Sequence, residues 1–202
     1  MKPILFLTAL FLASPALAHH PMGGEAPQTV FHGLISGLAH PVIGVDHLAF
    51  IVLIGIAAAL SGRVLAGPGA FIGATLLGTA LHLAGLSLPL AEWVILASIL
   101  GLGALLVTGQ RVTGPVALAG FALAGVFHGW AYGAAVIGAT PMPIFAYLLG
   151  FGVIQFAIAM SVALVAGRVL QRDPVPTRLA AALCMGVGLA FLFEAVEHAV
   201  LG

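Results

Sequence analysis

Six long apolar segments follow one another along this chain of 202 residues, with only short polar connections between them. About 20 apolar residues in an α-helix cross a bilayer core roughly 30 Å thick. The chain is 62% hydrophobic and 6% charged, whereas a soluble domain carries about 25% charged residues. The sequence therefore predicts an all-α fold, a polytopic membrane bundle of about six transmembrane helices. The segments are 28–60, 65–86, 90–109, 113–138, 142–167 and 178–201.

Residues 1–18 have the pattern of a cleavable signal peptide. Lys2 gives the positive start, residues 4–12 form a short apolar core, and residues 15–18 end in an A-x-A cleavage site. The apolar core is too short to span a membrane. We expect the remaining chain, residues 19–202, to form one six-span membrane domain.

The basic residues after the predicted signal peptide indicate how the chain is oriented. They are Arg63, Arg111, Arg168, Arg172 and Arg178. With six spans, all five fall on one side of the membrane, and the positive-inside rule assigns that side to the cytoplasm. We therefore expect a multi-pass protein of the bacterial inner membrane with both mature termini extracytoplasmic. The same topology puts the histidines in the outer half of the membrane or outside it.

His40, Asp46 and His47 place two imidazoles and a carboxylate close together in the first apolar segment. Ionisable side chains at membrane depth are costly and usually mark an ion or substrate pathway. Imidazole and carboxylate ligands suit nickel, cobalt, zinc or copper ions. Asp46 has a second interpretation, as a carboxylate that complements the dipole at a helix N-terminus. We predict that these three residues form the core of a metal site.

Pro41 and Gly44 lie between the two histidines and predict a broken helix. Proline has no N–H to donate, and transporter helices often break at a binding site. The first segment is also too long for one plain span. We expect a helix over 29–39, a break over 40–44 and a second helix over 45–60.

His128 lies in the fourth segment, beside glycines that are spaced four residues apart. Gly125, Gly129 and Gly133 form a small-residue face of the kind that lets two membrane helices pack closely. We predict that His128 is a metal ligand. The alternative is a packed histidine that is hydrogen-bonded to a backbone carbonyl.

The remaining candidate ligands lie near the predicted outer ends of the spans. They are His32, His82, Glu194, Glu197 and His198. Each could instead be an interfacial, solvated side chain. His19 and His20 would begin the mature chain, where an α-amine beside an imidazole could capture metal. A solvated terminus is the alternative for this pair.

Several function classes are not supported by the sequence. Cys184 is the single cysteine, so the chain has no disulfide framework and no CxxC motif. Basic and acidic residues are equal in number, which argues against nucleic-acid binding, and there is no nucleotide-phosphate motif. We expect no prosthetic group, and we expect a metal ion and the lipid bilayer as partners.

Taken together, these motifs resemble the HupE/UreJ family of bacterial nickel and cobalt permeases. The family's His-x5-Asp-His signature, with flanking Pro and Gly, is matched by His40, Asp46 and His47. Its second signature, Phe-His-Gly-x-Ala/Val-His-Gly-x-Glu, is matched in part by the segment that starts at Phe127. The chain has Tyr132 where the family has His and Ala135 where it has Glu, so two potential ligands are absent.

The resemblance implies a secondary permease that is not an enzyme. Its cargo would be a divalent transition metal taken up from the periplasm, with Ni²⁺ favoured and Co²⁺, Cu²⁺ and Zn²⁺ as alternatives. Two other functions stay open, an intramembrane metalloenzyme with an open coordination position and a metal-sensing accessory membrane protein. Protein partners that stay open are a second copy of the chain and proteins of metalloenzyme maturation.

Overall fold

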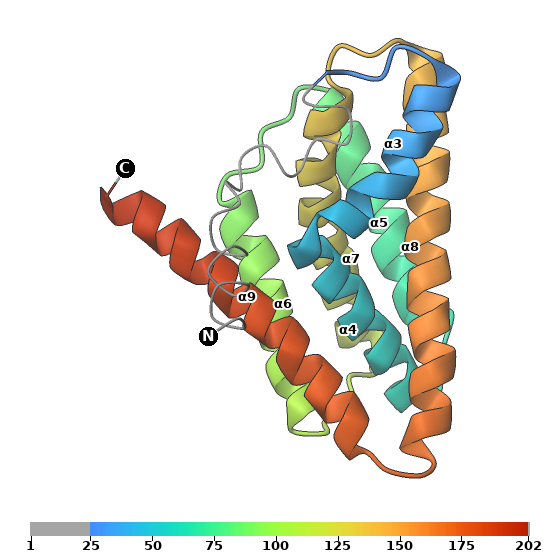
Figure 1. The fold of residues 1–202 in the computed structure, drawn as a ribbon, viewed down its shortest axis with the longest axis vertical. Helices are drawn as coiled ribbons and strands as arrows, with labels where there is room; N and C mark the ends of the chain where they lie inside the picture. Colours follow the sequence, from blue (N-terminus) through green and yellow to red (C-terminus); the bar gives the residue numbers. More distant parts are fainter. Residues whose placement is uncertain (1–24, 202) are drawn as a thin grey trace, which may run out of the picture.

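The computed structural model describes residues 25–201, and this part of the chain is helical without strands (Figure 1). The predicted signal peptide and His19–His20 lie outside the described residues. The helices are α3 (Val30–Ile43), α4 (Val45–Ser61), α5 (Ala66–Leu83), α6 (Ala91–Val107), α7 (Gly114–Gly133), α8 (Pro141–Leu170) and α9 (Val175–Leu201). A 3-10 turn, η1 (Ala134–Val136), follows α7.

The helices form the predicted polytopic membrane bundle. Four of them, α5, α7 with η1, α8 and α9, are long and apolar enough to cross a membrane, and the bent pair α3–α4 makes a fifth if the pair is one broken span. The third predicted segment forms α6, an apolar helix of 17 residues. At 1.5 Å per residue it is about 26 Å long, slightly less than the bilayer core. Length and composition thus support four or five spans, and the count of six stays a prediction that depends on α6.

Helix α4 is the central element of the bundle. It packs against α3, α5, α6, α8 and α9. Ten of its 17 residues are buried, as expected for a helix that is apolar on all sides. Because α4 begins with Val45, Asp46 and His47, the polar end of the central helix is carried into the interior.

The break in the first segment is shorter and later than predicted. Helix α3 continues through His40 and Pro41 to Ile43, so the predicted start of the break at residue 40 was wrong. Gly44 alone interrupts the helix, with φ −72° and ψ 90°, and α3 and α4 meet at 78°. Proline's fixed φ is compatible with a helix, and its missing N–H removes only one bond, to the carbonyl four residues earlier. The N–H of Gly44 still bonds the His40 carbonyl at 3.0 Å.

The predicted glycine face on α7 is confirmed. Cβ atoms added at Gly125, Gly129 and Gly133 would run into Phe71, Thr75 and His82 of α5. A second close pair is α3 with α8, where a Cβ added at Gly37 would meet the Tyr147 carbonyl. These two close contacts bring α5, α7, α3 and α8 together around the first turns of α4.

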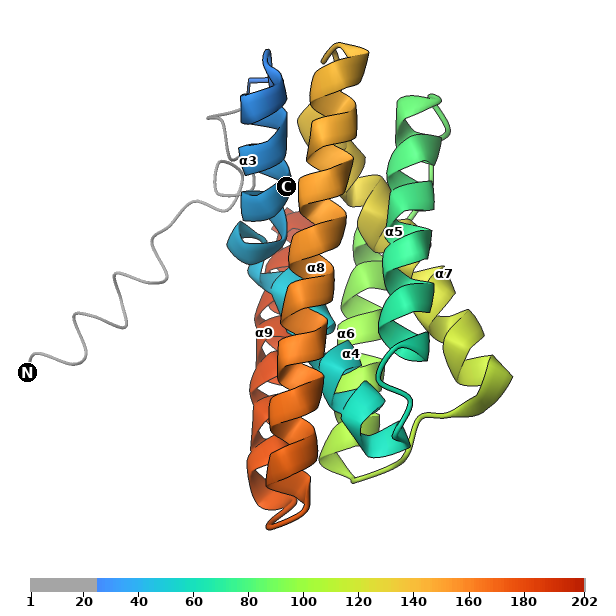
Figure 2. The same cartoon turned by 90° about the vertical axis from the view of Figure 1, so that its right-hand side faces the viewer.

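The connections α4–α5, α6–α7 and α8–α9 lie at one end of the bundle, while the start of α3 and the α7–α8 connection lie at the other (Figure 2). Arg63 and Arg111 lie in the first two of these connections, and Arg172 lies in the third. Arg168 and Arg178 belong to the helix turns that border the third. The five arginines therefore gather at a single end, and we refer to it as the arginine end.

Candidate metal centre

The bend at Gly44 brings His40, at the end of α3, next to the start of α4. A Cβ added at Gly44 would lie 3.0 Å from Cδ2 of His47 and 3.5 Å from the His40 carbonyl oxygen. A larger residue would therefore crowd the bend. The bend lies about midway between the two ends of the bundle (Figure 1), deeper than the outer ends of the helices.

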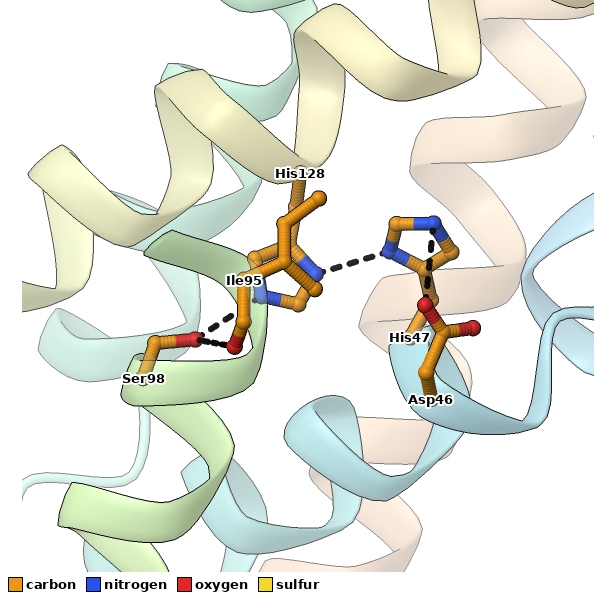
Figure 3. A network of polar contacts seen from close by, with 5 residues as sticks. All are labelled: Asp46, His47, Ile95, Ser98 and His128. Carbon is orange, nitrogen blue, oxygen red and sulfur yellow. Dashed lines mark hydrogen bonds and ion pairs between the residues drawn. The ribbon is translucent and has the colours of Figure 1, made fainter. Parts of the chain in front are cut away.

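His47 and His128 meet directly in the bundle interior, although 81 residues separate them in the chain. Their Nδ1 atoms are 2.8 Å apart, and the side chains of His47 on α4 and His128 on α7 point toward one another (Figure 3). His128 has 0% exposure and His47 has 6%. Two imidazoles from different helices are thus placed together away from solvent.

Ser98 of α6 determines which nitrogen His128 presents to His47. The Ser98 hydroxyl donates to the Ile95 carbonyl at 2.6 Å, so its oxygen accepts the hydrogen bond from Nε2–H of His128 at 3.0 Å. The tautomer of a histidine follows from the bond that its other nitrogen makes. Nδ1 of His128 then carries the lone pair and accepts from Nδ1–H of His47. A metal-ligating histidine is commonly oriented by such a contact.

Asp46 adds a carboxylate beside this pair. Its Oδ2 atom is 3.8 Å from Nε2 of His47 (Figure 3). Its Oδ1 atom is buried and has no hydrogen-bond partner among residues 25–201. Asp46 also lies in the first turn of α4, where the helix dipole favours a negative charge. Both interpretations of Asp46 made from the sequence are therefore compatible with its position.

His40 is held by a tyrosine of α8. The Tyr147 hydroxyl donates to the Tyr132 carbonyl at 3.2 Å and accepts from Nδ1–H of His40 at 2.8 Å. The Nε2 atom of His40 therefore carries the lone pair. His40 is buried, and its ring lies edge-on against the ring of Tyr132.

Tyr132 lies between the two histidines of the first motif. Its ring centroid is 4.8 Å from that of His40 and 4.2 Å from that of His47. The residue is fully buried, and its hydroxyl has no hydrogen-bond partner in the described part of the chain. One of the two positions at which the chain departs from the signature, Tyr132, therefore lies inside the centre, with an oxygen atom available there.

Aromatic side chains enclose the His128 ring. The Phe50 ring is stacked on it at 4.7 Å, and Phe71 meets it edge-on at 5.6 Å. Both phenylalanines are buried. Charges interact more strongly in such an apolar setting than in water, so an ion at this point would depend on the nearby nitrogen and oxygen atoms for its coordination.

The other candidate ligands lie elsewhere. The Nδ1 atom of His82 is 2.7 Å from the Trp130 carbonyl oxygen, so His82 joins α5 to α7. His32 lies in the first turn of α3 and is half-buried. Residues Glu194, Glu197 and His198 are exposed near the end of α9.

The described residues do not form a complete coordination shell in this conformation. Among residues 25–201, no group of three or more His, Cys, Asp or Glu side chains is close enough to hold a metal ion. What the fold brings together is the His47–His128 pair, with Asp46 on one side and His40 behind Tyr132. Coordination by more than two of these groups needs a movement of side chains or of the α3–α4 bend.

Two residues of the centre were not identified from the sequence, Ser98 and Tyr147. Tyr147 is one of only two tyrosines in the chain, and a buried hydroxyl usually has a hydrogen-bond partner. That rule could have marked Tyr147 as a partner for an intramembrane histidine. Ser98 donates a hydrogen bond to a carbonyl of its own helix, as serines within helices often do. The sequence therefore does not indicate that Ser98 also contacts a histidine.

Comparisons with known proteins show the family to which the chain belongs. A family model described as "HupE / UreJ protein" matches residues 7–191. The curated "Protein HupE" of Rhizobium leguminosarum bv. viciae is 33% identical over 128 residues, which cover 62% of this chain and 64% of that protein. The match thus spans less than two thirds of the relative. No solved structure matches the chain. Since the family model spans most of the sequence, the chain belongs to the HupE/UreJ family.

Proposed function

We propose that this protein is a secondary permease for a divalent transition metal, with Ni²⁺ as the favoured cargo. The family to which it belongs is associated with nickel and cobalt transport. The observation that carries the proposal is the buried contact between His47 and His128, 2.8 Å apart and contributed by two helices. Polar sites between helices, at a broken span near mid-depth, are typical of secondary transporters.

The cargo would bind between the two imidazoles. Metal–nitrogen distances of about 2.0–2.1 Å in a tetrahedral site put two ligand nitrogens roughly 3.3 Å apart. The two Nδ1 atoms, now 2.8 Å apart, need to separate slightly to admit an ion. The proton of His47 would also have to move from Nδ1 to Nε2, the nitrogen nearer Asp46, because a ligating nitrogen must be deprotonated. Asp46 would supply charge compensation, and His40 and the Tyr132 hydroxyl would supply further ligands. Imidazole also binds cobalt, copper and zinc, so the preference for nickel rests on the family.

The orientation follows from the arginine end. Gathered at one end of the bundle, the five arginines fit a cytoplasmic surface of the inner membrane. The start of α3 and the end of α9 would then face the periplasm, so the cargo enters from that side. Exposed carboxylates and imidazole near the end of α9, with the predicted terminal histidines, would attract cations there.

Uptake into proteoliposomes tests the proposal. Nickel, cobalt, copper and zinc are offered separately, and accumulated metal is measured by mass spectrometry. We expect wild type to accumulate nickel, and we expect His47→Ala and His128→Ala to lose accumulation. The exposed variant His198→Ala serves as the matched control and should transport. Size-exclusion profiles show that each variant is folded. Equal accumulation in wild type and both buried variants would contradict the proposal.

A further inference from the structure

A cavity of about 400 Å³, open along one side to the outside of the bundle, lies between α6 and α7. Its walls come from Leu102 and Leu105 on α6 and from Ala117, Gly120 and Ala124 on α7. At one extreme it is lined by the α6–α7 connection, residues 110–113, which belongs to the arginine end. The cavity therefore extends from the arginine end into the bundle.

The opposite extreme of the cavity reaches the candidate metal centre. Phe50 and Ser98 line the cavity there, and both also contact His128. The Phe50 ring is stacked on the His128 ring at 4.7 Å, and the Ser98 hydroxyl bonds its Nε2 atom at 3.0 Å. A single layer of side chains thus separates the His47–His128 pair from the cavity.

We propose that this cavity is the inner half of the cargo's route, and that Phe50 and Ser98 form the gate between the metal centre and the route. The inference rests on the proposed permease function and deepens it, because it specifies where the ion leaves the centre. The ion passes from the imidazoles past the Ser98 hydroxyl into the cavity. It then leaves between the α6–α7 connection and the start of α7.

The lining suits passage better than retention. Ala117, Gly120 and Ala124 have small side chains or none, which keeps the cavity wide. The ion can therefore pass with water ligands still bound. Between Ser98 and the mouth the walls are mostly apolar and offer no strong ligand, and conduction requires binding that is weak enough to leave. Gln110 and Thr113 provide polar groups at the mouth.

Arg111 also lines the mouth and repels cations. Its side chain is exposed, and salt screens exposed charges over about 8–10 Å. The repulsion therefore adds a small barrier to exit and disfavours re-entry from the cytoplasmic side. The same features would suit a lipid, with its tail in the apolar cavity and its phosphate on Arg111. The experiment distinguishes these two occupants.

Plugging the cavity tests the route. A Cβ added at Gly120 meets nothing within 4 Å, so Gly120→Trp fills the cavity without overlapping the backbone. Gly101 on α6 is equally open and does not line the cavity, so Gly101→Trp is the matched control. We expect Gly120→Trp to bind nickel with wild-type affinity in detergent and to lose nickel uptake. Gly101→Trp should keep both. Wild-type uptake by Gly120→Trp would overturn the inference.

Thiol labelling gives an independent readout that does not require the plug. Cys184 is the single native cysteine and is buried, so Gly120→Cys is made together with Cys184→Ser. We expect a membrane-impermeant thiosulfonate to label residue 120 in inverted vesicles, and we expect the label to stop uptake. A thiol that the reagent does not reach indicates a lipid-filled groove and overturns the inference, as does labelling without loss of uptake. Failure of the permease function itself would instead appear as absence of uptake by wild type.

Discussion

Two regions of this protein carry the same kinds of side chain in opposite surroundings. The candidate metal centre combines Asp46 with His47 and His128, and the end of α9 combines Glu194 with His198. The first group lies in the middle of the bundle, where His47 contacts His128 of another helix and Asp46 lies beside His47 on the same helix. The side chains of the second are exposed on a single helix. The same residue types thus meet between helices in one region and lie exposed on one helix in the other.

The difference originates in helix packing. The start of α4 is enclosed because α4 packs against five other helices and because glycines let the flanking helix pairs approach closely. Helix α9 leans away from the bundle, and its last turns lie apart from the other helices (Figure 1). Residue type indicates which side chains could bind a metal ion, and packing decides which of them meet.

The largest effect is expected from removing the two facing imidazoles. His47→Asn and His128→Asn should each weaken nickel binding by at least about 100-fold, the upper limit for losing a mere supporting contact. Since both histidines would bind the same ion, the double variant should lose little more nickel affinity than either single variant. Isothermal titration calorimetry on the solubilised protein measures these affinities.

A second pair of variants provides the control for this cycle. His198→Asn alone should bind nickel with wild-type affinity. The double variant His198→Asn with His128→Asn should bind nickel with the same affinity as His128→Asn alone. Fully additive losses for His47→Asn and His128→Asn would mean that the two histidines bind different ions, which would contradict a shared site.

The next effect concerns the packing that encloses the centre. Gly37→Ala places a methyl group against the Tyr147 carbonyl and should destabilise the fold by about 1–3 kcal/mol. It should also weaken nickel binding, because it shifts the helix pair that carries His40 and Tyr147. Thermal unfolding in detergent measures the stability.

Gly186→Ala on α9 is the matched control for this packing effect. A Cβ there meets nothing within 4 Å, and alanine favours a helix by about 1 kcal/mol over glycine. We expect this variant to be as stable as wild type or slightly more stable. If both alanine variants unfolded at the same temperature, close approach of α3 and α8 would not support the centre.

A smaller effect is expected from Ser98→Ala. The variant removes the oxygen that accepts from Nε2–H of His128, so the ring loses its fixed tautomer and orientation. Loss of such a supporting contact reduces metal affinity by about 10-fold or more. Ser98→Thr retains the hydroxyl and should restore most of the affinity in the same titration. Equal nickel affinity in wild type and the alanine variant would show that Ser98 does not orient His128.

The smallest effect is expected at the end of α9. One combined variant replaces both carboxylates and the imidazole there, and thereby removes charges that steer cations. Its substitutions are Glu194→Gln, Glu197→Gln and His198→Asn. Steering changes rates at low ionic strength and is screened within about 8 Å at physiological salt. Initial uptake rates should fall in low salt and match wild type in physiological salt. Complete loss of uptake at both salt concentrations would show that the site essential for transport lies on α9.

The fold could be predicted from the sequence because the bilayer restricts a chain with so little charge to helices. The glycine face of α7 was also predicted, since its four-residue spacing reports directly on helix contact. The break was predicted over residues 40–44 and proved shorter, because Pro41 stays within the helix and only Gly44 leaves helical geometry. Local sequence does not show which of two helix breakers ends a helix when packing holds the other in place.

The candidate site could be predicted only in part. His40, Asp46, His47 and His128 were identified individually from the cost of placing them in a membrane. Their pairing depends on the crossing of α4 and α7, which residue spacing within one segment does not reveal. Tyr147 was missed because a tyrosine near a span end is normally interfacial. Ser98 was missed because its hydroxyl also serves its own helix.

X-ray absorption at the nickel edge most directly tests whether His47 and His128 bind the same cargo ion. The fine structure of nickel-loaded, solubilised protein reports how many imidazole rings surround the metal. The spectrum of wild type should show imidazole ligands. One ring should be lost in His128→Asn, one should be lost in His47→Asn, and none should be lost in His198→Asn. An unchanged imidazole signal in both buried variants would contradict the proposed centre.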